Sequence, residues 1–158
     1  MGRLTDETNK RDDVQEDQAL SLKLLVVLSK AYKSVMDKAA RDVKNYDLSL
    51  SEFGILEVLY AKGQIPIQQI GGKVLVTSGT MTYNIDKLEQ KGFVKRIPCP
   101  TDRRVINASL TDAGQSLLDR IFPLHAQGIE RIMQGLTTEQ KQQAIELLKW
   151  LGKGAKQQ

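Results

Sequence analysis

The feature that most constrains the fold is a succession of capped helical segments that begins at residue 49. Residues 49–52 read Ser-Leu-Ser-Glu, which has the form of a capping box, and Gly63 ends the helix that this box begins. Pro66 suits the first turn of a short helix over residues 67–74. The spacing therefore predicts two helices joined by a tight turn.

A third helix follows, and its outer face carries small, hydrogen-bonding and basic residues. Thr77 and Ser78 are both good caps for it, and Gly92 closes it after Lys91. The apolar residues of its inner face are Met81, Ile85 and Leu88. The residues of its outer face are Gly79, Thr80, Tyr83, Asn84 and Lys87. Such side chains are suited to contacting base edges and phosphates.

Two strand-like segments, residues 93–97 and 105–110, flank a loop that carries Arg103 and Arg104. Apolar residues alternate along the second segment, as in a half-buried strand. The two segments therefore predict a β-hairpin with a basic tip. Helix, turn, helix and basic hairpin, in this order, predict a winged helix-turn-helix in a chain that is mainly α with a small β-hairpin.

Long helices are predicted on both sides of this region. From Asp17 to Lys44 apolar residues recur at helical spacing, and a helix of that length spans ~42 Å. So small a domain cannot cover it, and we expect part of its apolar stripe to meet a partner chain. Thr111 caps a second long helix, which Pro123 bends rather than ends, and a capping box at residues 137–140 opens the last helix.

The chain is predicted to divide into a short tail and a single domain. Residues 1–16 are polar and charged, and we expect a flexible acidic tail. Residues 17–158 then form one domain. Within it, residues 47–110 are the winged helix-turn-helix, and residues 17–46 and 111–153 are the flanking helices.

Positive charge is concentrated in one segment. The formal net charge is +4, and between Thr77 and Arg104 six lysines and arginines face three acidic residues. A positive patch confined to a short segment indicates a site for a polyanion. A solvated surface is the alternative for any single basic run, but the helix and hairpin pattern beneath the charge favours nucleic acid.

The composition argues against several other classes of protein. The single cysteine, Cys99, rules out an internal disulfide, and the single histidine, His125, leaves little for a metal or catalytic cluster. We therefore expect no metal, no cofactor and no enzymatic activity. No apolar stretch approaches the ~18 residues of a membrane span, and the amino terminus lacks the hydrophobic core of a secretory signal, so we expect a cytoplasmic protein.

Three kinds of DNA contact are predicted. At the helix N-terminus, where free N–H groups favour anions, Thr77 and Ser78 are expected to meet phosphates, with plain capping as the alternative. The residues expected to reach base edges or the groove are Thr80, Tyr83 and Asn84, with Thr82 on the DNA backbone. The basic residues expected to bind phosphate are Lys87, Lys95 and Arg96. A solvated face is the alternative for each of these.

Two fragments of the sequence resemble a known family. The first runs Asp102-Arg103-Arg104-Val105 and continues at Leu110-Thr111-Asp112-Ala113-Gly114. The second is Met81-Thr82-Tyr83 through Leu88-Glu89-Gln90-Lys91-Gly92-Phe93-Val94. Together, and in this order, they are similar to the multiple-antibiotic-resistance regulators, the MarR family, over about residues 20–152.

A narrower likeness lies in Arg96-Ile97-Pro98-Cys99-Pro100-Thr101-Asp102-Arg103-Arg104 and Ile121-Phe122-Pro123-Leu124-His125. These fragments resemble the methylhydroquinone-resistance regulators within that family. The resemblance implies a repressor of genes that detoxify quinones and catechols, released by a small phenolic or quinone-like effector.

The family resemblance also implies a homodimer on double-stranded DNA. Residues 17–46 and 111–153 would form a dimerisation stalk, the third helix would enter the major groove, and the wing would reach the flanking minor groove. A twofold dimer places its recognition helices ~34 Å apart, so the operator should be an inverted repeat with half-sites ~10 bp apart. Asp102 is expected to pair with one wing arginine, and Arg103 is assigned to the minor groove.

Two places are candidate effector sites. Cys99 lies near Arg96 and Arg103, and positive neighbours would lower its pKa and favour attack on a quinone, although an unreactive loop cysteine is the commoner interpretation. The residues that the resemblance implies for an effector pocket are Tyr32, Met36, Phe53 and Leu56. Ordinary core packing is the commoner explanation for these.

Two alternatives to an effector-released repressor stay open. One is a winged-helix DNA binder without an effector, regulated by its abundance. The other is a small enzyme or protein-interaction module with an incidental wing. His125 and Trp150 are interpreted as structural residues rather than ligands.

Overall fold

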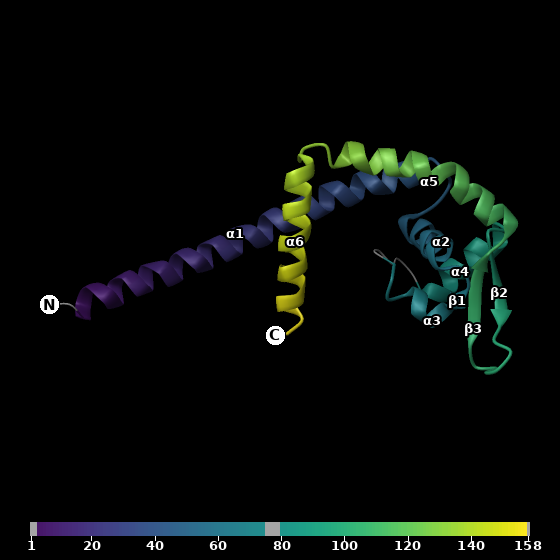
Figure 1. The fold of residues 1–158 in the computed structure, drawn as a ribbon, viewed down its shortest axis with the longest axis horizontal. Coiled ribbons are helices and arrows are strands. Elements are labelled where there is room, and N and C mark those ends of the chain that lie inside the picture. Colours follow the sequence, from purple (N-terminus) through teal and green to yellow (C-terminus); the bar gives the residue numbers. More distant parts are fainter. Residues whose placement is uncertain (1–2, 75–79, 158) are drawn as a thin grey trace. The chain divides into compact units, whose positions relative to one another are not determined.

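The structure is a computed structural model that describes residues 3–74 and 80–157 (Figure 1). These residues are mainly helical and include one small antiparallel sheet. By its contacts the chain divides into two compact units, Met1–Lys38 and Ala39–Gln158. The first unit is formed by α1, and the second contains the end of α1 together with all the later elements.

Helix α1 (Arg3–Lys44) begins earlier than the apolar spacing predicted. The predicted start was Asp17, after a flexible tail. Residues 3–16 contain neither proline nor glycine, so the local sequence does not interrupt the helix. The helix ends as predicted, before a turn in which Asp47 has a left-handed φ of 57°. The division of the chain into tail, stalk and reading region stays a prediction.

Helix α2 (Leu50–Lys62) begins at the predicted capping box. The Ser49 hydroxyl accepts from the Glu52 backbone N–H, and the Glu52 carboxylate accepts from the Ser49 N–H. Gly63 ends the helix with a φ of 72°, a conformation that favours glycine, and its N–H donates to the Leu59 carbonyl. Both ends of α2 therefore follow from local sequence signals.

Strand β1 (Ile65–Pro66) and helix α3 (Ile67–Ile70) follow. The strand was not predicted, because two residues are too few to show an alternating pattern. It pairs with β3, Ile65 opposite Ala108, so the sheet has the order β1-β3-β2. Helix α3 is shorter than the predicted segment 67–74 because it ends before Gly71 and Gly72, and glycine is unfavourable within helices.

Helix α4 (Met81–Gln90) is followed by the hairpin strands β2 (Val94–Pro98) and β3 (Ile106–Leu110). The strands pair antiparallel from Val94 opposite Leu110 to Pro98 opposite Ile106. They run side by side in Figure 1, joined by the loop that forms the tip. The predicted helix-turn-helix and wing are therefore confirmed as fold elements.

Helices α5 (Asp112–Ile132) and α6 (Thr138–Ala155) complete the chain. Thr111 caps α5 as predicted, and Pro123 lies inside that helix instead of ending it. Thr137 and Gln140 form the second predicted capping box at the start of α6.

The hydrophobic core of the second unit lies among the end of α1, the helices α2 to α5 and the sheet. Its largest fully buried apolar side chains are Ile55, Leu56, Leu59, Ile70, Ile85, Leu88, Leu118, Ile121 and Val43. The inner face of α4 packs into this core through Ile85 and Leu88, and its outer face stays exposed. The core therefore fixes which side of α4 a ligand can reach.

Helix α6 shows a different pattern, because none of its residues is buried against the rest of the described chain. Its exposed large apolar residues are Ile145, Leu147, Leu148, Trp150 and Leu151. Helix α1 likewise exposes Leu20, Leu22, Leu24, Leu25, Val26 and Val27. Among the described residues, no helix combines the length and apolar character that crossing a membrane requires.

Candidate nucleic-acid interface

Thr80 caps the N-terminus of α4, with its hydroxyl accepting from the Tyr83 backbone N–H at 3.1 Å. The caps predicted from sequence were Thr77 and Ser78, so the start of the helix is corrected by about one turn. Thr77, Ser78 and the neighbouring Gly79 lie outside the described residues, and their predicted contacts stay predictions. Thr80 itself is exposed, so its hydroxyl can cap the helix and face a ligand.

The outer face of α4 presents Thr82, Tyr83 and Lys87, which are all exposed. The Lys87 ammonium lies 5.0 Å from the centre of the Tyr83 ring, which is within cation–π distance. Contact with the Tyr83 side chain also raises the pKa of Lys87, so this lysine stays charged. A hydroxyl, an aromatic ring and a cation thus share one helical face.

Asn84 is the exception among the predicted outer residues. Its side chain is 3% exposed, and its amide nitrogen donates to the Thr80 carbonyl at 3.2 Å. The expectation that Asn84 lies on the outer face is therefore corrected. The helical spacing placed it at the border between the two faces, and its amide satisfies the backbone of the first turn.

Arg96, on β2, lies against two carboxylates of α4. Its Nη1 is 2.7 Å from Asp86 Oδ1, and it also pairs with Glu89. The Arg96 backbone N–H donates to the same Glu89 carboxylate at 3.2 Å. The predicted phosphate ligand therefore ties the wing to α4, a role that the sequence reasoning missed. The signal was present as two acidic residues three apart on α4, one turn before a basic strand.

The wing tip separates its two arginines. The Arg104 backbone N–H and Nε both donate to Asp102 Oδ1, at 3.0 and 3.2 Å, and Nη2 donates to Oδ2 at 3.3 Å. These bonds from Arg104 lower the pKa of Asp102. Arg103 is exposed and forms no ion pair with any other described residue. The structure brings together Asp102 and one wing arginine as expected, and that arginine is Arg104.

The basic residues from Lys87 to Arg104 thus fall into two groups. Lys91, Arg96 and Arg104 each pair with a carboxylate of the protein. The other three, Lys87, Lys95 and Arg103, form no ion pair with any residue in the described ranges 3–74 and 80–157. These three lie on the outer face of α4, on β2 and at the wing tip. The cations that an external anion could contact therefore lie on both α4 and the wing.

Cys99 lies in the wing loop with its Sγ 3.3 Å from Thr101 Oγ1. The side chain and backbone of Thr101, followed by the Asp102 backbone, lower the pKa of the Cys99 thiol by hydrogen bonding. Arg96 and Arg103, the neighbours invoked from sequence, are not among the causes of this shift. The direction of the expected shift is therefore found, and its physical cause is different.

The base of the wing is fixed to α5 by the segment Leu110 to Gly114. Thr111 donates through its hydroxyl to the Gly92 carbonyl at 2.6 Å and through its backbone N–H to the Phe93 carbonyl at 3.0 Å. A Cβ on Gly114 would lie 2.1 Å from the Phe93 carbonyl oxygen, so only glycine fits there. This segment therefore holds the end of α4 and the start of the wing in one place.

A hollow of about 430 Å³ lies beside α4. Its lining residues come from α3, the turn after it, α4, β2 and β3, and they are Ile67, Gln68, Gly71, Met81, Thr82, Arg96 and Ile106. The walls are mostly apolar, with Gln68, Thr82 and Arg96 as polar groups. Sequence reasoning did not assemble this hollow, because it draws on segments far apart in the chain.

The residues predicted for an effector pocket have different environments. Phe53 and Leu56 are buried in the core, and the Phe53 ring lies 4.3 Å, between centroids, from the ring of His125. Tyr32 is 58% exposed and Met36 is partly buried, both in the first unit. The pocket itself stays a prediction. In the described part of the chain, no group of three or more metal-ligating side chains lies together.

Comparisons with known proteins agree with this geometry. A sequence model of the MarR family matches residues 48–106. The HTH-type transcriptional regulator MhqR of Bacillus subtilis is 47% identical over 137 residues, which cover 87% of this chain and 94% of the relative.

Two solved structures are similar in fold. Sco3205, a MarR family transcriptional regulator from Streptomyces coelicolor solved in complex with DNA, has a TM-score of 0.78 at 23% identity, covering 86% of this chain and 88% of its own. Bordetella bronchiseptica BpsR, whose DNA binding is regulated by 6-hydroxynicotinic acid, has a TM-score of 0.71 at 20% identity, covering 80% and 90%.

Proposed function

Because the chain belongs to the MarR family and is a DNA-binding transcriptional regulator, we propose that it grips an inverted-repeat operator with α4 and the wing and represses the adjacent genes. Membership of this family places it among regulators of transcription and not among enzymes. Such a regulator would act in the cytoplasm, beside the chromosome.

The observation that carries this proposal is a set of basic side chains that form no ion pair with the residues that the structure describes. Lys87, Lys95 and Arg103 are exposed on α4, β2 and the wing tip. An unpaired cation on a protein surface can release condensed counterions by contacting a phosphate, which is the main source of DNA affinity. Tyr83, exposed on the same helix as Lys87, is then the residue of α4 that we propose for the groove, and the exposed Thr82 is proposed to contact the DNA backbone.

The operator is proposed to meet two copies of the chain. The exposed apolar residues of α6, and those of α1, are more than an isolated protein of this size usually presents to water. A twofold dimer that buries them would carry two α4 helices, and its symmetry would require a palindromic site.

A small phenolic or quinone-like effector is proposed to release the repressor. The resemblance to the methylhydroquinone-resistance regulators and the 47% identity to MhqR support placing this chain in that subgroup of the family. The hollow beside α4 offers a planar phenol mostly apolar walls, with Gln68, Thr82 and Arg96 as the polar residues. Occupancy there would act on the helix proposed to read DNA. Cys99, with its lowered pKa, is the proposed site for a covalent effector.

Footprinting on the DNA upstream of its own gene tests the whole proposal. We expect two protected half-sites about 10 bp apart, weakened by added catechol or benzoquinone. Comparing wild type with Cys99→Ser separates the two routes of release: a reversible ligand acts on both proteins, and a covalent one spares the variant. Absence of any protected site in this region would contradict repression of the adjacent genes from an operator there.

The alternatives make different predictions in the same assay. A regulator without an effector protects the same site at unchanged affinity throughout a titration with catechols and quinones. An interaction module with an incidental wing loses less than about tenfold in DNA affinity when Arg103 and Arg104 both become alanine, since phosphate and groove contacts should cost more.

A further inference from the structure

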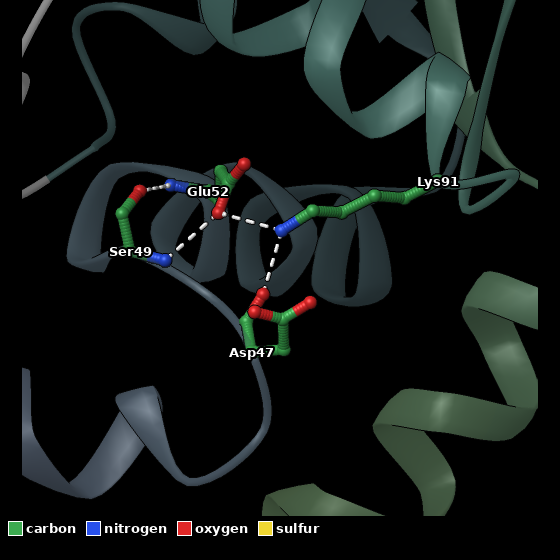
Figure 2. Close-up of polar contacts among 4 residues, drawn as sticks. All are labelled: Asp47, Ser49, Glu52 and Lys91. Carbon is green, nitrogen blue, oxygen red and sulfur yellow. Dashed lines mark hydrogen bonds and ion pairs between the residues drawn. The ribbon is translucent and has the colours of Figure 1, made fainter.

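Lys91, the residue that ends α4, extends away from the DNA-facing side of that helix into the protein. Its Nζ donates to the Asp47 carbonyl oxygen at 2.6 Å and to Glu52 Oε2 at 3.2 Å. The same Glu52 oxygen accepts from the Ser49 backbone N–H at 2.8 Å. Figure 2 shows the four residues converging, with Lys91 reaching across to the turn before α2.

Burial gives this contact its strength. Glu52 is 4% exposed, and a carboxylate withdrawn from water needs a compensating charge and hydrogen bonds. Lys91 supplies the charge, as the ion-pair partner found for Glu52 among the described residues, and the Ser49 N–H supplies a further donor. The positive charge of Lys91 is therefore used inside the protein and is not offered to a phosphate.

The second acceptor depends on backbone geometry. Asp47 has a φ of 57°, in the left-handed region that aspartate tolerates better than most residues with a side chain. The turn that contains it directs the Asp47 carbonyl toward Lys91. A single ammonium group thus joins the end of α4, the first turn of α2 and the turn before α2.

The position of this contact on α4 decides its mechanical effect. The Thr80 cap at the other end is local to the helix and does not connect it to the core. A helix of ten residues is ~15 Å long, so a tilt of about 10° around its anchored end would move the far end by ~2.6 Å. Hydrogen bonds to base edges tolerate only a few tenths of an ångström. A small change at Lys91 would therefore produce a larger displacement where Tyr83 is proposed to meet the bases.

We propose that Lys91 is a positioning residue for DNA reading: by holding Glu52 and the Asp47 carbonyl, it sets the angle at which α4 enters the groove. This rests on the proposed function, in which α4 contacts an operator. Lys91 lies in the same basic segment as Lys95, but Lys91 contacts groups of the protein itself. Lys95 is instead proposed to contact a DNA phosphate.

The test compares Lys91→Met with Lys95→Met in the full-length protein. Each variant is titrated, over a range of salt, against the duplex protected by footprinting and against a scrambled duplex of the same composition. Lys95→Met should weaken binding to both duplexes and reduce the slope of log K against log salt by about 0.9, the value for one lost phosphate contact. Lys91→Met should keep the wild-type slope and lose about tenfold in preference for the operator, the size of one base contact.

A double variant separates positioning from stability. Lys91→Met leaves Glu52 charged and buried, which lowers stability. In Glu52→Gln/Lys91→Met no buried charge is left, and glutamine retains the capping box, so thermal unfolding should return close to that of wild type. The preference for the operator should stay reduced, because the contact of Lys91 with Glu52 and the Asp47 carbonyl is still missing. Lys91→Arg, which keeps the donors, should restore part of that preference.

Three results decide the matter. A salt slope reduced in Lys91→Met as much as in Lys95→Met would make Lys91 a phosphate ligand and overturn the proposal. If the double variant prefers the operator as strongly as wild type does, the Lys91 contact does not position α4, and the proposal is overturned. If wild type itself does not prefer the footprinted duplex, the proposed function fails first, before any variant is compared.

Discussion

The two adjacent arginines of the wing loop, Arg103 and Arg104, have different contacts. The sequence indicates that one of two adjacent arginines pairs with Asp102, and the assignment of Arg103 to the minor groove left Arg104 for this pair. The choice depends on the turn, because the Asp102 side chain folds back on the Arg104 backbone N–H and the Arg104 guanidinium then follows. The prediction that Asn84 lies on the outer face of α4 was wrong for a similar reason, because a side-chain amide can donate to a carbonyl of its own helix as well as face outward.

The first prediction at this scale concerns the unpaired wing arginine. Arg103→Ala should weaken operator binding by about tenfold or more and reduce the salt slope by ~0.9, because it removes a cation that no described carboxylate neutralises. Arg104→Ala, the matched control, should cost less, since it mainly loosens the Asp102 turn. Fluorescence anisotropy at several salt concentrations measures both. A larger loss from Arg104→Ala would reassign the groove contact.

The second prediction concerns the reactivity of Cys99. Thr101 lowers the pKa of the thiol by bonding to its ionised form, so the thiolate fraction and the rate of alkylation rise at a lower pH than in the unfolded chain. Thr101→Val should move the midpoint of the pH–rate curve for iodoacetamide upward and slow the reaction at pH 7. Wild type in urea gives the reference midpoint. Identical midpoints for folded and unfolded wild type would contradict the assigned hydrogen bonds.

At the scale of helices and strands, local signals predicted most of the fold. The capping boxes at Ser49 and Thr137, and the caps at Thr111 and Gly63, lie where the sequence indicated, since each is satisfied within a few residues. Thr80 replaced the predicted caps because several adjacent threonines and serines could serve. Strand β1 escaped prediction because it exists only through pairing with β3, about forty residues away.

The prediction at this scale concerns the junction of wing and α5. Gly114→Ala should lower the free energy of unfolding by roughly 1–3 kcal/mol or more, because the new Cβ would meet the Phe93 carbonyl and displace the backbone. Gly135→Ala, where nothing lies within 4 Å of a Cβ, should change it by less than about 0.5 kcal/mol. Urea unfolding at one fixed protein concentration compares them. Equal stability of the two variants would show that the junction is not closely packed.

At the scale of the whole molecule, the sequence indicated apolar surface without a partner in the same chain. The length of α1 suggested such a surface near the start of the sequence, and the exposed apolar side chains of α6 form another near its end. Neither pattern reveals the arrangement of two chains, because surface complementarity depends on side chains that are far apart in sequence. The hollow beside α4 could not be predicted from the sequence for the same reason, because its lining residues come from four elements.

The last prediction therefore concerns assembly. Trp150 and Leu147 lie three residues apart on α6, are 66% and 60% exposed, and border a hollow of about 410 Å³ on that helix. If this surface is buried in a dimer, the double substitution Leu147→Glu/Trp150→Glu places two charges in an apolar interface and should convert the dimer to monomer in sedimentation equilibrium. Leu147→Met/Trp150→Phe keeps the surface apolar and should leave the dimer intact.

DNA binding should follow assembly, because one chain offers a single α4 to an operator with two half-sites. Joining two half-site contacts in one particle makes the second contact intramolecular, and the gain in affinity is commonly ~10²-fold or more. The charged double variant should lose that gain for the full operator and keep its weak affinity for an isolated half-site, as the folded second unit still carries α4 and the wing. A charged variant that stays dimeric would remove α6 from the interface, and a monomer that binds the full operator like wild type would remove the need for two copies.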